Sequence, residues 1–230
     1  MNRRIAITQS NYIPWKGYFN VIRETDAFVL LDDVQYTRRD WRNRNLIKTQ
    51  AGVKWLTIPV DVKGNYYIRI KDVQTANDHW RIDHWNAIQN AYKRSPYFAE
   101  YREYFENIYL GSKERNLSII NFNFIKLINL LLKIETPIHW SMDFDPPSGK
   151  TERLVHISKC LKASEYISGP AAKNYLDLKQ FEENHIKVTW VDYSNYPVYR
   201  QLYEPFDHHV SIIDLLFNEG SNAPAYLNRI

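Results

Sequence analysis

The fold is decided by residues 4–31, RIAITQSNYIPWKGYFNVIRETDAFVLL. It begins with a short apolar run at residues 4–7, which is typical of a buried strand. Residues 17–25 then show the periodicity of a helix, and residues 27–31 form a second β-rich run. A strand, a helix and a strand within about 30 residues predict a βαβ unit of a parallel sheet with a right-handed crossover.

The last third of the chain returns to the same alternation. Three more strands are expected at residues 138–140, 165–168 and 187–191, and helices at residues 151–162, 171–184 and 210–217. The final helix is expected to stop at Gly220. The sequence therefore predicts an α/β fold whose centre is an open, mostly parallel sheet of about five strands.

Two insertions interrupt this alternation. Strand-like runs at residues 54–60 and 66–70 flank Gly64 and Asn65, which predicts an antiparallel β-hairpin insertion within residues 50–75. The segment 79–133 is expected to add three helices, at residues 79–93, 96–110 and 117–133. Because no linker-like tract divides the chain, we expect residues 1–230 to form a single domain.

Composition limits the classes of function. Cys160 is the only cysteine, so disulfides and cysteine-rich metal sites are excluded within one chain, and a cytoplasmic protein is expected. Cys160 itself is expected to be a buried structural thiol on an amphipathic helix. The most apolar stretch, residues 125–134, is about half as long as a membrane span, so no membrane partner is expected. The net charge of +4 and the 17 tyrosines suit sugars, phosphorylated molecules or RNA alike.

Known catalytic motifs are missing from the sequence. It contains no His-Glu-x-x-His, so a metal site is not expected. It also contains no Walker loop and no Gly-x-Gly-x-x-Gly, and it has only seven glycines. Any phosphate would therefore be held by side chains and helix ends.

The segments that follow the strands are the candidate site, because ligands of open parallel sheets bind beyond the carboxyl ends of the strands. The turn after the first strand, residues 8–17, mixes amides, hydroxyls and aromatic rings ahead of a helix N-terminus, where anions are favoured. Its candidate binding residues are Gln9, Asn11, Tyr12 and Trp15. The alternative is a turn whose polar groups cap the helix and whose rings pack inward.

A second candidate group follows the second strand. Asp32 and Asp33 are candidate catalytic residues, because paired carboxylates can orient an amine or bind Mg²⁺. The polar run behind them suits phosphate, which guanidinium groups bind in a bidentate manner. Its candidate binding residues are Gln35, Tyr36, Arg42, Asn43, Arg44, Asn45 and Lys48. The alternative is a solvated loop whose charges offset one another.

The remaining candidates come from later in the chain. The expected binding residues near the end of the strand at 165–168 are Arg153, Ser168, Gly169 and Lys173. His84 is the third candidate catalytic residue, as a proton acceptor, and its alternative is packing on a helix beside Trp80 and Trp85. The pair at 208–209 is expected to be a solvated turn.

Taken in order, these segments resemble the WbqC-like protein family, found among bacterial proteins of surface-polysaccharide biosynthesis. The matching stretches are residues 9–19, 31–36, 43–49, 55–60, 151–154, 166–169 and 211–220. The family commonly has His-Gln-Pro where this chain has Thr8-Gln9-Ser10, so any role of that histidine has no counterpart here. A weaker similarity, at the level of the fold, is to pantothenate synthetase and other nucleotidylyltransferase-like proteins, which bind ATP at this turn.

The resemblance implies an aminoacyl- or acyltransferase, or an ATP-dependent enzyme, that forms an amide on a nucleotide-linked amino sugar of surface glycans such as O-antigen. In that scheme Asp32 and Asp33 orient the amine or a metal, and Arg42, Arg44 and Lys48 hold phosphates. The donor stays open among ATP with Mg²⁺, a thioester on an acyl or aminoacyl carrier protein, and coenzyme A. The alternative is a non-catalytic protein that binds a sugar nucleotide or RNA, although a nucleic-acid partner is not expected.

Overall fold

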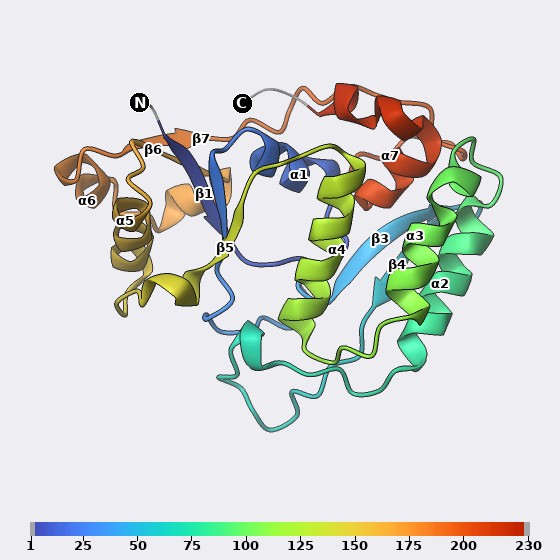
Figure 1. The fold of residues 1–230 in the computed structure, drawn as a ribbon, viewed down its shortest axis with the longest axis horizontal. Helices are drawn as coiled ribbons and strands as arrows, with labels where there is room; N and C mark the ends of the chain where they lie inside the picture. Colours follow the sequence, from blue (N-terminus) through green and yellow to red (C-terminus); the bar gives the residue numbers. More distant parts are fainter. Residues whose placement is uncertain (1–2, 228–230) are drawn as a thin grey trace.

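A five-stranded sheet lies at the centre of the computed structural model, which describes residues 3–227 (Figure 1). The order of the strands is β5-β2-β1-β6-β7, and all four pairs are parallel. The strands are β1 (Arg4–Thr8), β2 (Ala27–Leu30), β5 (Ile138–Trp140), β6 (Glu165–Ser168) and β7 (Lys187–Trp190). The predicted α/β fold with a parallel sheet is confirmed.

The order of the strands reverses beside β1. From β1 the chain steps outward through β2 to β5, and it then returns to the other side of β1 with β6 and β7. Ligands of such sheets bind where the order reverses, at the carboxyl ends of the strands. A ligand-binding site is therefore expected at the carboxyl ends of β1 and β6.

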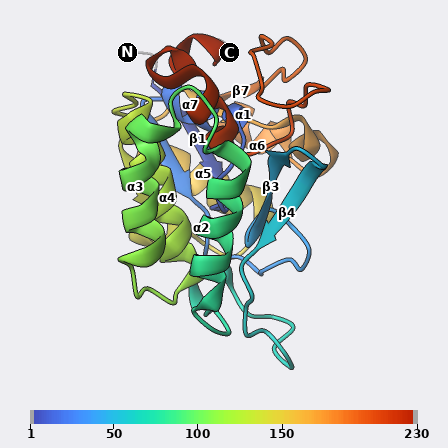
Figure 2. The ribbon, with the colours of Figure 1, turned by 90° about the vertical axis from the view of Figure 1, so that its right-hand side faces the viewer.

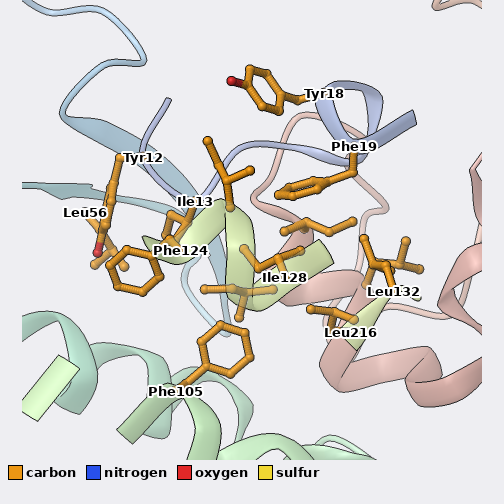
Figure 3. Packing of buried hydrophobic residues seen from close by; sticks show 14 of the residues in the cluster. Tyr12, Ile13, Tyr18, Phe19, Leu56, Phe105, Phe124, Ile128, Leu132 and Leu216 are labelled. Carbon is orange, nitrogen blue, oxygen red and sulfur yellow. The ribbon is translucent and has the colours of Figure 1, made fainter. Parts of the chain in front are cut away.

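Helices cover both faces of the sheet (Figure 1). Ile5 and Ile7 of β1 pack with α5 (Lys150–Cys160) and α6 (Leu178–Glu183). Ala6 points to the opposite face, because side chains alternate along a strand, and it joins the larger core. That core includes α1 (Lys16–Arg23), α4 (Leu117–Leu131) and α7 (Ile212–Glu219), whose side chains Phe19, Ile128 and Leu216 converge in Figure 3.

The helical insertion is confirmed. It consists of α2 (His79–Tyr92), α3 (Phe98–Leu110) and α4, and the side chain of Asn116 caps α4 by accepting a hydrogen bond from the backbone of Ile119. In Figure 2, α2 lies between α3 and the antiparallel pair β3–β4. The 3-10 helices are η1 (Ile70–Asp72), η2 (Ser141–Phe144), η3 (Pro170–Asn174) and η4 (Gly220–Tyr226).

The predicted antiparallel hairpin is present, but its strands are not the predicted runs at residues 54–60 and 66–70. The antiparallel pair is β3 (Arg44–Thr49) with β4 (Gly52–Thr57), and Gly52 supplies the positive φ of the turn, +104°. Residues 66–70 form no strand and contribute only an isolated bridge between Arg69 and Gln35. The sequence misleads because β3 carries a polar residue, Asn45, on its buried face.

Two smaller expectations also fail. The helix expected at residues 171–184 is split into η3 and α6, and the second part begins where the side chain of Asp177 accepts a hydrogen bond from Lys179. Cys160 is exposed rather than buried, because the buried face of α5 runs through Leu154 and Ile157 and Cys160 lies outside it. No helix among the described residues is long and apolar enough to cross a membrane.

Candidate functional site

A cavity of about 290 Å³ opens between the carboxyl ends of β1 and β6. This is the point where the strand order reverses, and the volume lies near the lower end of small-molecule sites. The polar and aromatic residues of its lining are Thr8, Gln9, Asn11, Trp15, Tyr18, Phe28, Tyr166, Ser168, Tyr175 and Tyr193. Among the described residues, none that lines this cavity is an acid, a lysine or an arginine.

Two segments that are far apart in the sequence form its polar edge. The turn from β1 to α1 provides the predicted residues Gln9, Asn11 and Trp15, and the end of β6 provides Ser168 and Gly169. Thr8, which stands where the resembling family has histidine, also lines the cavity. Two of the three strand-end segments expected to share a crevice therefore line this cavity, and the third, at Asp32 and Asp33, does not.

The backbone of the β1–α1 turn is held by side chains behind it. Asn45 donates hydrogen bonds to the carbonyl oxygens of Tyr12 and Ile13, each at 3.0 Å. Arg42 donates to the carbonyl oxygen of Ser10 at 3.3 Å and to the side-chain oxygen of Asn11. Ile13 has a φ of +37°, which is rare for a β-branched residue and persists only where the surroundings fix it.

Asp32 belongs to the same support. Its side chain is fully buried and accepts hydrogen bonds from the backbone N–H of Ser10, at 2.8 Å, and from the hydroxyl of Ser118. Burial raises the pKa of Asp32, and the bonds from Ser118 and Ser10 oppose that rise. Asn121 donates to the hydroxyl of Ser10 and to the carbonyl oxygen of Arg42. We call Asp32, Arg42, Asn45 and Asn121 the turn clamp.

Asp33 and Arg153 form an ion pair with a shortest N–O distance of 3.3 Å. The hydroxyl of Ser141 donates a further hydrogen bond to Asp33 at 2.5 Å. Neither Asp32 nor Asp33 lines the cavity, although Leu31 before them and Leu154 after Arg153 do. The two candidate carboxylates therefore lie behind its wall.

The basic run is engaged with the protein itself. Arg44 donates to the carbonyl oxygen of Arg39 and lies 4.2 Å from the ring centre of Trp55. Asn43 donates to the carbonyl oxygen of Ile58, and Lys48 to that of Pro205. Because these donors bind backbone, the geometry does not favour the predicted phosphate site, which stays a prediction.

Tyr12 and His84 lie in the core rather than in the cavity. The hydroxyl of Tyr12 is 2.9 Å from Nδ1 of His84 and 2.5 Å from the hydroxyl of Tyr109. Burial lowers the pKa of His84 to about 4. A buried histidine with a tyrosine partner matches the packing alternative for this residue.

Three further candidates lie outside the main cavity. Gln35 and Tyr36 line a separate hollow of about 340 Å³, and Gln35 donates to the carbonyl oxygen of Tyr66. Lys173 is exposed on η3, with its ammonium 5.5 Å from the ring centre of Trp190.

A second hollow of about 130 Å³, which the sequence did not predict, adjoins the main cavity. It shares Asn11 and Trp15 with that cavity, and Pro14, Trp41, Asn45 and His209 complete its lining. The only local signal is Asp207, two residues before His209, a spacing that allows contact between the two side chains. The neighbourhood of Trp15 and Trp41 comes from the tertiary fold and has no local signature.

Cys160 and the acidic residues offer no further site. Sγ of Cys160 lies 3.5 Å from Nε2 of His156, but that nitrogen is also 2.9 Å from the carbonyl oxygen of Phe144. A carbonyl oxygen only accepts, so Nε2 carries the proton and cannot take one from the thiol. Within residues 3–227, no three histidine, cysteine or acidic side chains gather as metal ligands would.

Comparisons with known proteins give one family and one relative. The family model described as "WbqC-like protein family" matches residues 9–226. A protein of Mycobacterium tuberculosis (strain ATCC 25618 / H37Rv), named "Uncharacterized protein Rv1507c", is 45% identical over 225 residues, which cover 98% of this chain and 97% of that protein. No solved structure matches the chain.

Proposed function

The chain belongs to the WbqC-like protein family, and from this premise we propose that it forms an amide on the amine of a nucleotide-linked amino sugar. The reaction would serve the biosynthesis of bacterial surface glycans. The observation that carries the proposal is the cavity between β1 and β6, the position at which sheets of this order bind nucleotides.

The chemistry of the lining suits a sugar and a base. Hydroxyl and amide groups, such as those of Thr8, Gln9 and Ser168, both donate to and accept from sugar hydroxyls. Aromatic rings such as Trp15 and Tyr193 offer stacking surfaces for a nucleobase.

In this proposal two lysines outside the cavity lining supply the positive charge for the phosphates. The ammonium of Lys150 is 5.8 Å from the ring centre of Tyr175, which lines the cavity. Lys173 is on the adjacent η3. With Arg42 occupied by the turn clamp, we assign the diphosphate to Lys150 and Lys173 in place of the basic run.

A specific observation favours a second candidate function, a sugar-nucleotide-binding protein without catalysis. None of the residues that line the main cavity, among those described, is an acid, a lysine or a histidine. A reaction that removes a proton from an amine needs an acceptor, and a binder needs none.

Calorimetric titration with a nucleoside-diphosphate-linked 4-amino sugar tests the binding step. The matched ligand carries a 4-hydroxyl in place of the amine. Tyr175→Ala should weaken binding at least tenfold, because it removes a ring from the cavity, whereas Tyr66→Ala, which truncates a similarly exposed tyrosine in the separate hollow, should not. Absence of binding by the unmodified protein would overturn both candidate functions.

Product mass then separates the enzyme from the binder. The protein is incubated with the amino sugar nucleotide and, in turn, an acyl thioester of coenzyme A, an acyl carrier thioester, or a carboxylic acid with ATP and Mg²⁺. We expect amide with one donor and none with the 4-hydroxyl sugar. Binding without product in all three mixtures would favour the binder.

A further inference from the structure

His209 lines the second hollow, and its side chain is 81% exposed there. Oδ1 of Asp207 accepts a hydrogen bond from the backbone N–H of His209 at 2.7 Å and lies 3.2 Å from Nδ1 of its ring. The ring of Trp15 is stacked near it, with centres 6.4 Å apart and planes at 23°. An aspartate beside Nδ1 favours the tautomer that has its proton there, so Nε2 keeps its lone pair.

Asn11 lines both hollows, and its amide has a fixed orientation. Arg42 has only donors, so the side-chain oxygen of Asn11 faces the guanidinium. The NH2 group of Asn11 is therefore the part of the amide available to a ligand. Such a donor can stabilise the negative oxygen that develops when a carbonyl group is attacked.

We propose that the second hollow holds the acyl group of a thioester donor and that His209 accepts the proton of the attacking amine. This inference rests on the proposed function, in which the amino sugar occupies the main cavity. Because Asn11 and Trp15 line both hollows, the two substrates would lie beside each other.

The step balances with the thioester as the second reactant. The amine nitrogen of the sugar attacks the thioester carbonyl carbon, and a C–N bond forms while Nε2 of His209 takes the amine proton. The carbonyl oxygen is stabilised by the NH2 group of Asn11. The C–S bond then breaks, and His209 returns the proton to the departing thiolate, so the products are an amide and a thiol.

The size of the hollow limits the acyl group. A volume of about 130 Å³ equals the liquid volume of about four water molecules, so a short acyl or small aminoacyl group fits. Trp41 continues the wall to the surface, where its ring lies 5.4 Å from that of Trp55. The two indoles are 40% and 43% exposed and offer an apolar track for the pantetheine arm, which coenzyme A and carrier proteins share.

Variants of His209 test the catalytic step. His209→Gln should lower kcat about 100-fold and leave the dissociation constant of the sugar nucleotide within twofold. Its pH–rate profile should lose the limb that falls toward low pH, and imidazole should restore part of the activity of His209→Ala. His79→Gln, at an exposed position on α2, is the matched control. Unchanged kcat in His209→Gln would overturn the role of His209.

Binding of a non-reacting analogue tests the hollow without relying on turnover. The probe is the ketone analogue of acetyl-pantetheine, in which CH2 replaces sulfur. Trp41→Ala should weaken its binding at least tenfold, whereas Tyr104→Ala, an exposed tyrosine on α3, should not. If the analogue binds in this way but no amide forms with any donor, the thioester site stands and the proposed function fails. If it does not bind, or binds Trp41→Ala equally well, the thioester site is wrong.

Thioesters of coenzyme A and of a carrier protein then identify the source of the arm. Acetyl transfer from either supports the proposal, and the donor with the higher kcat/KM is the physiological class. Transfer only from a carboxylic acid with ATP would overturn it.

Discussion

Asn45 is a polar residue on the buried face of a strand, and its amide binds two carbonyl groups of the β1–α1 turn. A buried carbonyl without a partner costs about 1–3 kcal/mol, so this side chain contributes to the stability of the turn together with the rest of the turn clamp. The strained backbone of Ile13 depends directly on it.

Asn45→Asp should destabilise the protein by about 2–4 kcal/mol, because it removes the donor and places a carboxylate against two carbonyl oxygens. Urea unfolding measures the change. Asn65→Asp, the same substitution in an exposed loop, should stay within about 0.5 kcal/mol of the unmodified protein. Equal stabilities of the two variants would show that the turn does not need Asn45.

Two glycines near the cavity differ in the space that a side chain would have. A Cβ at Gly17 would lie 2.3 Å from the ring of Trp15, whereas a Cβ at Gly169 would meet only the Tyr193 hydroxyl, at 3.6 Å. The protein itself therefore requires glycine at 17, and at 169 it leaves space beside the cavity.

Gly17→Ala should cost about 1–3 kcal/mol of stability through this clash. Gly169→Ala should leave stability within about 0.5 kcal/mol but weaken binding of the sugar nucleotide, because the methyl group enters the space meant for the ligand. Thermal unfolding and calorimetric titration of both variants check this. Undiminished binding by Gly169→Ala would mean that the ligand does not approach β6.

At the residue scale, the sequence was a good guide to which segments lie together. It was a poorer guide to what their side chains bind. Gln9, Asn11 and Ser168 line the cavity as expected from their places after strands. Arg42 and Asn45 looked like ligands for phosphate but hold backbone. Local sequence cannot separate these roles, because a donor aimed at a phosphate and one aimed at a distant carbonyl belong to the same residue types.

Among the elements, α7 carries a buried acid that links three parts of the chain. Asp214 accepts hydrogen bonds from Tyr92 of α2, at 3.0 Å, and from Tyr199 of the loop after β7, at 2.8 Å. Burial raises the pKa of Asp214 to about 6, against the lowering effect of these bonds. Ionisation of Asp214 is therefore less favourable in the folded protein than in the unfolded chain.

Stability contributed by Asp214 should grow as pH falls, because its folded-state pKa of about 6 exceeds the ordinary value of 3.8. The gain begins near pH 6, is complete below about pH 4 and amounts to at most about 3 kcal/mol. Urea unfolding from pH 4 to 7 should show it as the difference between the unmodified protein and Asp214→Asn, since His84 and Asp32 titrate in both. Parallel curves would contradict the prediction.

Helices and strands were predicted correctly where the spacing of apolar residues reveals the secondary structure. The prediction failed where polar residues are buried. The strand β6 was predicted with its observed bounds, and the helices α2 and α3 within about two residues. The strand β3 was missed because Asn45 and Lys48 are buried on its two faces by contacts with other segments. Such contacts are long-range and leave no period in the local sequence.

For the whole molecule, the larger core joins the sheet to both insertions. Ala6 of β1, Ile47 of β3, Trp85 of α2 and Phe217 of α7 belong to one continuous cluster of buried side chains. The hairpin and the added helices therefore share their apolar contacts with the sheet and have no separate core.

Unfolding should be a single cooperative transition, as expected when both insertions share a core with the sheet. Circular dichroism in the far ultraviolet, tryptophan fluorescence and calorimetry should give the same midpoint within error. Two resolved transitions would show that the helical segment at 79–133 is an independent unit.

The turn clamp also links ligand binding to the order in which parts of the chain dock during folding. Its four members come from the segment after β2, the segment before β3, β3 and α4, and Ser10 contacts three of these places. The floor of the cavity is thus complete only when segments up to about a hundred residues away have docked, and contacts of such sequence separation form slowly. During refolding, binding at this cavity should therefore appear only after these segments have docked.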